Sequence, residues 1–208
     1  MKSFAALGIG LLGDRGFAPE ILKALQQPSE ETLRGSYAIA LGLLEETKAV
    51  ETLLKLVETR SSAQRLRGYA AIALGMLKAE GTLERMIRVL EEDPDKVDVW
   101  RRALLLGIGA FGSPKAGPAL TKVLATDNRD MVREHAALAL NLCRAKSEIE
   151  PLAKLLEKEG YRGEIALTAS PPSRGLGDRH EYPLISEAFF SFNFRMRNAF
   201  IEDLEYVL

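Results

Sequence analysis

The sequence is short of the residues from which disulfide frameworks, redox centres and most transition-metal sites are built. Its 208 residues include one cysteine, two histidines and one tryptophan. A single cysteine excludes an intrachain disulfide and a metal site made from paired cysteines, and it fits a reducing compartment. We therefore expect a cytoplasmic protein that folds without disulfides.

A surplus of charge of one sign is also missing. The chain carries 28 Lys and Arg residues against 29 Asp and Glu residues, which gives a formal net charge of −1. Such a balance creates no strong overall field that draws a protein onto nucleic acid or an anionic membrane. We expect neither of them as a partner.

The amino-terminal stretch MKSFAALGIGLLG has the basic start and short apolar run of a signal peptide, but no A-x-A-like cleavage site follows it. We interpret it instead as the first helix of a repeat. Met1 already stands inside that repeat, with no polar unit before it. Because the end of a repeat stack needs a polar face, we expect either a longer parent chain or an end that a partner covers.

The sequence does contain a unit that recurs five times, at intervals of 32 to 34 residues. The units align on a reference residue, which is Gly10, Gly42, Gly75, Gly109 and Asn141 in turn. Eight positions earlier each unit carries a basic residue: Lys2, Arg34, Arg67, Arg101 and Arg133. Two positions earlier the residue is always small: Gly8, Ala40, Ala73, Gly107 and Ala139. Such a period is typical of stacked units that bury one continuous core together.

Each unit has the pattern of two helices joined by a turn of about four residues. After the turn, apolar residues stand 11, 14 and 15 positions past the reference, as in Met86, Val89 and Leu90. Apolar residues at three- and four-residue spacing mark one face of an α-helix. The small residues of the first helix predict close approach between neighbouring helices. Because the arginine recurs, we predict that its side chain contacts carbonyl groups or acidic side chains of the adjacent unit.

The pattern Arg-x-x-Ala-Ala-x-Ala-Leu-Gly, present as RLRGYAAIALG and approximated by VREHAALALN, resembles HEAT repeats of the short bacterial type that phycobilin lyase subunits also contain. The resemblance covers residues 1–158. It implies an all-α fold, a right-handed α-solenoid of about five helix pairs in which the second helices line the concave face. Because such solenoids serve many unrelated tasks, it specifies the fold far better than the function.

Residues 159–208 break the period and are expected to form a separate capping tail. Three prolines and four glycines between positions 160 and 183 exclude a continuous helix. The segment FSFNFRMR alternates apolar and polar residues, as a strand of a short β-ribbon does, while Phe189, Phe192, Met196 and Phe200 also fit a helical face. A final helix at AFIEDLEYVL fits both alternatives. The tail either covers the last repeat or pairs with the sheet edge of a partner.

One basic residue recurs on every second helix, 13 positions past the reference. The five residues are Lys23, Lys55, Arg88, Lys122 and Lys154. Stacking aligns them in a row, which we call the basic row, and the family resemblance places it in the concave groove, where an acidic peptide or another protein would bind. In the alternative interpretation the row only stabilises its own helices. Glutamates stand four residues before or three residues after three of the basic residues, at positions 51, 58, 84, 91, 150 and 157.

The other candidates for chemistry are weak. Cys143 and Trp100 occupy apolar positions of the repeat, so we predict that both are buried. His135 and His180 each adjoin a glutamate, and His-Glu pairs hold iron in deoxyhypusine hydroxylase, another HEAT-repeat protein. However, the positions equivalent to His135 hold Phe4, Ser36, Tyr69 and Ala103, so the repeated ligand set is missing. We expect no metal, no cofactor and no catalytic residues.

Two functions fit this sequence. The first is a non-catalytic scaffold that binds another protein or an acidic peptide along the groove of the second helices, through the basic row. The alternative, which the resemblance alone implies, is a bilin lyase-like subunit that handles a tetrapyrrole together with a partner chain. No phosphate-binding glycine loop or nucleophile elbow favours an enzyme.

Overall fold

A stack of helix pairs makes up the part of the chain that the computed structural model describes, residues 2–79, 81–92, 97–148 and 151. The first helices of successive pairs are α1 (Lys2–Leu12), α3 (Glu31–Leu43), α5 (Gln64–Leu77), α7 (Asp98–Ala110) and α9 (Asp130–Cys143). The second helices are α2 (Ala18–Gln26), α4 (Val50–Glu58), α6 (Thr82–Glu92) and α8 (Gly117–Thr126). The predicted all-α solenoid is confirmed. Lys154, the predicted β-ribbon and the predicted final helix lie outside the described residues.

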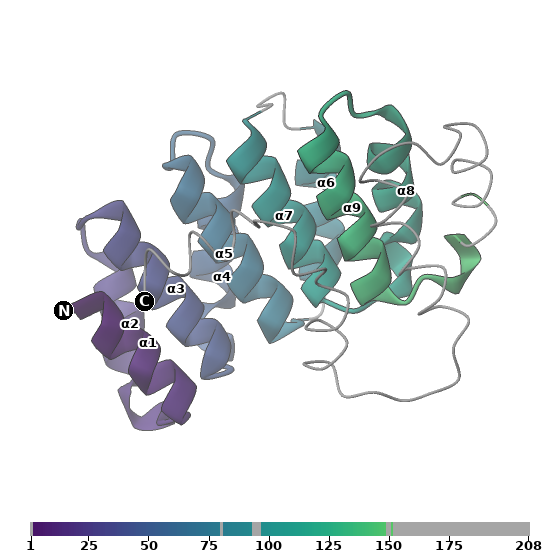
Figure 1. Cartoon of the computed structure of the whole chain (residues 1–208). Coiled ribbons are helices and arrows are strands. Elements are labelled where there is room, and N and C mark those ends of the chain that lie inside the picture. Colours follow the sequence, from purple (N-terminus) through teal and green to yellow (C-terminus); the bar gives the residue numbers. More distant parts are fainter. Residues whose placement is uncertain (1, 80, 93–96, 149–150, 152–208) are drawn as a thin grey trace.

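The helices form two layers, visible in Figure 1 as a row of first helices with the second helices behind it. Each first helix packs against the first helices of the neighbouring pairs, and each second helix packs against the first helix of the next pair. The amino-terminal stretch forms helix α1, as the repeat pattern predicts. Among the described residues, no helix is long and apolar enough to cross a membrane.

The short turns between the paired helices are built by polar side chains at equivalent positions. Asp14, Glu46 and Ser113 each accept a hydrogen bond from the backbone N–H two residues later, at 3.0, 3.0 and 3.4 Å. Each bond starts a single turn of 3-10 helix: Arg15–Phe17, Thr47–Ala49 and Pro114–Ala116. Because these side chains satisfy N–H groups that a helix start leaves unpaired, the chain turns at the same place in these three pairs.

The recurring arginine joins each pair to the one before it. Its guanidinium donates to a carbonyl in the last turn of the preceding second helix, from Arg34 to Leu25 (3.1 Å), Arg67 to Val57 (3.1 Å), Arg101 to Leu90 (3.1 Å) and Arg133 to Leu124 (2.8 Å). The carbonyls at a helix end lack partners within the helix and carry partial negative charge, so a cation there is stabilising. The predicted stacking contact of this arginine is confirmed.

Trp100 and Cys143 belong to the core, as predicted. Trp100 is 1% exposed and lies under the guanidinium of Arg67, whose central carbon is 3.9 Å from the ring centroid. Cys143 is fully buried in α9, and burial raises the pKa of its thiol to about 12. A thiol with that pKa stays protonated at neutral pH and is a poor nucleophile. Neither residue is placed to bind a ligand.

Candidate functional site: the basic row of the second helices

The basic row lies on the solvent-exposed sides of the second helices. Lys23, Lys55, Arg88 and Lys122 are exposed on α2, α4, α6 and α8, one residue on each helix. The reason is the helical period, which turns the apolar residues of each helix toward the core, such as Leu53, Leu54 and Val57 on α4. The sequence therefore placed these four cations on one repeated face, while the fifth, Lys154, lies outside the described residues.

The glutamates near the basic row bind across helices instead of along them. Glu58 on α4 accepts two hydrogen bonds from Arg85 on α6, at 2.8 and 2.7 Å, and Glu51 lies 3.6 Å from the same guanidinium. Glu91 on α6 lies 3.7 Å from the ammonium of Lys122 on α8. Adjacent second helices are close enough for these contacts between helices. Within the described residues Lys23, Lys55 and Arg88 form no ion pair, so the predicted neutralisation along each helix is absent there.

A small cavity opens beside the row, between the carboxyl-terminal ends of α4 and α6. Its volume is about 230 Å³, and it is lined by four arginines and two glutamates: Arg60, Arg67, Arg85, Arg88, Glu58 and Glu92. The hydrogen bonds that Arg85 donates to Glu58 raise the pKa of Arg85, so this guanidinium stays charged. The repeat pattern does not reveal Arg60 and Arg85, because arginine does not recur at their positions in the other units. An arginine at a position where the other units have different residues is the signal in the sequence that could have identified them.

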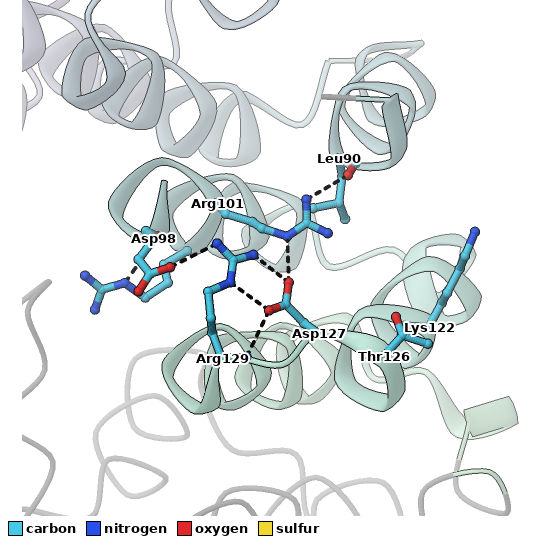
Figure 2. Close-up of polar contacts among 8 residues, drawn as sticks. Leu90, Asp98, Arg101, Lys122, Thr126, Asp127 and Arg129 are labelled. Atoms are coloured by element: carbon cyan, nitrogen blue, oxygen red, sulfur yellow. Dashed lines mark hydrogen bonds and ion pairs between the residues drawn. The ribbon is translucent and has the colours of Figure 1, made fainter. Parts of the chain in front are cut away.

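A second polar cluster joins the turn after α8 to α7, as Figure 2 shows. The carboxylate of Asp127 accepts hydrogen bonds from Arg129 at 2.7 and 2.8 Å and from Arg101 at 3.1 Å. Arg129 also reaches Asp98 at 3.0 Å. Two arginines and two aspartates thus match each other's charge. The cluster fastens the fourth helix pair to α9 and has no surplus charge to attract a ligand.

The Asp127 cluster predicts a pH dependence of stability. Hydrogen bonds from Arg129 lower the pKa of Asp127 below its ordinary 3.8, against the opposing effect of burial. A depressed pKa stabilises the fold fully above the unfolded value, and this contribution is lost as the pH falls through the lower folded value. We expect Asp127→Asn to lose about 1.5–3 kcal/mol at pH 7. The difference from wild type will shrink below about pH 4 in denaturant titrations, and a constant difference down to pH 3 would contradict this assignment.

His135 is a buried core residue. Its side chain lies in α9, 5% exposed, with Nδ1 2.7 Å from the carbonyl oxygen of Met131 one turn earlier. Over the described ranges, no group of three or more His, Cys, Asp or Glu side chains is arranged to hold a metal ion. His180 lies outside those ranges. His135 therefore packs in the interior next to its own helix and forms a hydrogen bond with a backbone carbonyl group of that helix.

Comparisons with known proteins agree with this architecture. The family profile described as HEAT repeats matches residues 18–104, 59–141 and 98–168. Among solved structures, the chain is similar to one from the complex of CpcE and CpcF of phycocyanin lyase from Nostoc sp. PCC7120, with 27% identity and a TM-score of 0.57. The match covers 76% of this chain and 64% of that one. No curated protein sequence matches the chain.

The similarity to a lyase corrects one expectation from the sequence. The lack of a recognisable nucleophile, metal set or phosphate-binding loop led to the prediction of a chain that is not an enzyme. A solved structure that resembles it is part of a phycocyanin lyase complex, and this similarity contradicts the prediction. The prediction failed because motif searches find catalytic groups of known spacing, whereas a repeat surface has no such signature.

Proposed function

This chain belongs to the HEAT-repeat family, and from that premise we propose that it is one subunit of a lyase complex that binds a second protein chain and a tetrapyrrole substrate. The observation that carries the proposal is the similarity to the complex of CpcE and CpcF, which is a phycocyanin lyase made of two chains. The 27% identity extends over three quarters of this chain, so the likeness involves more than one repeat.

The basic row is the surface that we propose for the partner chain. Lys23, Lys55 and Arg88 are exposed and form no ion pair within the described residues. An acidic protein can therefore bind these cations without first breaking an ion pair inside this chain. Lys122 has a single contact at 3.7 Å, with Glu91, and both side chains are largely exposed. Surface pairs of this kind contribute little and exchange easily. Complementary charge along such a row directs association and fixes the register of two proteins.

The test combines the purified chain with CpcE, with CpcF, and with biliverdin as the tetrapyrrole, followed by size-exclusion chromatography with detection at visible wavelengths. We expect the chain to elute together with one of the two proteins, and the tetrapyrrole absorbance to elute with that complex. Elution of the chain alone, free of visible absorbance in every mixture, would refute the proposal.

Charge reversal tests the basic row within the same experiment. The variant Lys23→Glu/Lys55→Glu/Lys122→Glu should weaken partner binding at least about tenfold, a loss of roughly 1.4 kcal/mol. A matched control reverses Lys48, Lys78 and Lys115, which are exposed in the turns between paired helices. The control should bind as wild type does, and both variants should melt near the wild-type temperature because exposed substitutions cost little. Equal weakening by both variants would mean that only net charge matters and would remove the row from the proposal.

A further inference from the structure

Three arginines beside the cavity depart from the repeat pattern. Where Arg60 stands, the other units have Pro28, Asp93, Asp127 and Glu159. Where Arg85 stands, they have Glu20, Thr52, Ala119 and Pro151. Where Arg88 stands, they have Lys23, Lys55, Lys122 and Lys154. A residue that every junction needs for stacking recurs in every unit, as the arginine that caps the preceding helix does. Arginines that occur together at a single junction therefore have a role at that junction other than the general stacking of the repeats.

These arginines converge on the cavity of about 230 Å³ between the ends of α4 and α6. Arg85 is held by its two hydrogen bonds to Glu58, and Arg60 reaches the carbonyl oxygen of Glu92 at 3.5 Å. Arg67 is held by Val57 and by the ring of Trp100. Three of the four guanidinium groups are therefore positioned before any ligand arrives, which reduces the entropy that binding has to overcome.

The charges at the cavity are unequal. Among the described residues, four guanidinium groups line the cavity together with the carboxylates of Glu58 and Glu92, and Glu51 lies 3.6 Å from Arg85, which leaves a surplus of one positive charge. Arg88 is exposed at the rim and forms no ion pair within the described residues. An anion would balance this surplus. The cavity exceeds the roughly 30 Å³ of one water and falls below the roughly 300–1,000 Å³ of pockets for drug-sized ligands.

We propose that this cavity binds the phosphate group of a small phosphate monoester. A phosphate monoester is an anion with a charge of about −1.5 to −2 at neutral pH, and its three terminal oxygens accept from several donors at once. The planar fork of arginine suits that geometry, and the ammonium of lysine does not. This accounts for arginine at position 88, where the equivalent residues are lysines. The inference is separate from the proposed lyase function.

Isothermal titration calorimetry of the full chain tests the site, at fixed ionic strength, with inorganic phosphate, glycerol 3-phosphate and succinate as the three probes. We expect one molecule of glycerol 3-phosphate to bind per chain. Tighter binding of glycerol 3-phosphate than of inorganic phosphate supports an ester as the ligand, while equal or tighter binding of inorganic phosphate supports recognition of the phosphate group by itself. Binding of succinate in preference to both phosphates, or binding of neither phosphate, overturns the proposal.

Variants locate the binding. Arg60→Ala and Arg88→Ala should each weaken binding of glycerol 3-phosphate about tenfold or more, and Arg88→Lys should weaken it less because the charge remains while the fork is lost. Lys23→Ala is the matched control, since it removes a cation from the equivalent position of α2, away from the cavity. Thermal melting of each variant shows that it is folded. If Lys23→Ala weakens binding as much as Arg88→Ala does, the effect is general attraction and the cavity is not the site.

Discussion

Gly107→Ala will destabilise this protein by about 2–3 kcal/mol, although the change adds one methyl group and alanine is the best helix former. A Cβ atom at position 107 in α7 would lie 2.3 Å from the carbonyl oxygen of Ala71 in α5 and 2.6 Å from its carbonyl carbon. Both are backbone atoms of a packed helix, so α5 and α7 have to move apart along their whole contact. The gain in helix propensity, about 1 kcal/mol, does not offset that loss.

The first repeat offers a control at the equivalent position. Gly8 stands two residues before its reference residue, as Gly107 does, but an added Cβ atom at Gly8 meets nothing within 4 Å. Gly8→Ala should therefore stabilise the chain by about 0.5–1 kcal/mol, because alanine loses less backbone entropy in a helix. Unfolding midpoints in denaturant, measured for both variants beside wild type, should move in opposite directions. A common direction would show that the close approach of α5 and α7 does not limit stability.

The fold was predictable from the sequence because the same pattern of residues occurs in five aligned repeats. The small residue two positions before the reference recurs in all five units, and so does a basic residue eight positions before it, which reaches the preceding helix in four of them. A pattern that occurs in five units predicts the helices even where the sequence of a single unit is ambiguous. What the sequence did not reveal is how near the helices come. Alanine is tolerated at this position in three units, whereas the junction of α5 and α7 leaves no room even for a Cβ atom at Gly107.

The surface was harder to predict than the fold because its contacts join residues that are distant in the chain. Sequence spacing pairs Glu58 with Lys55, three residues away on the same helix. The structure pairs it with Arg85, 27 residues further on, because α4 and α6 lie side by side. The basic row could be located because it recurs. The cavity could not, since Arg60 and Arg85 occur at one junction and their convergence depends on the spacing of two helices that no repeat pattern encodes.

Arg67→Met will cost about 3–4 kcal/mol, estimated from the separate losses of a buried hydrogen bond and a cation–π contact. The side chain is 1% exposed, donates to the carbonyl oxygen of Val57 at 3.1 Å, and covers the ring of Trp100. Methionine keeps most of the apolar contact but leaves that carbonyl without this donor, at a depth that water does not readily reach. Arg34→Met is the matched control, because Arg34 makes the same bond to Leu25 from a half-buried position. There water can replace the donor, and we expect a loss of only about 1 kcal/mol.

A double-mutant cycle separates the contribution of the ring from that of the carbonyl. If the stacking of Arg67 on Trp100 stabilises the fold, then Arg67→Met and Trp100→Leu remove the same contact, and the double variant should lose about 1–2 kcal/mol less than the sum of the single losses. Additive losses would assign the whole effect to the hydrogen bond with Val57. Replacing a buried charge by an apolar residue is neutral or stabilising in some proteins. An Arg67→Met variant as stable as wild type would place this chain among them, and it would show that the recurring arginine is not needed to hold α5 against α4.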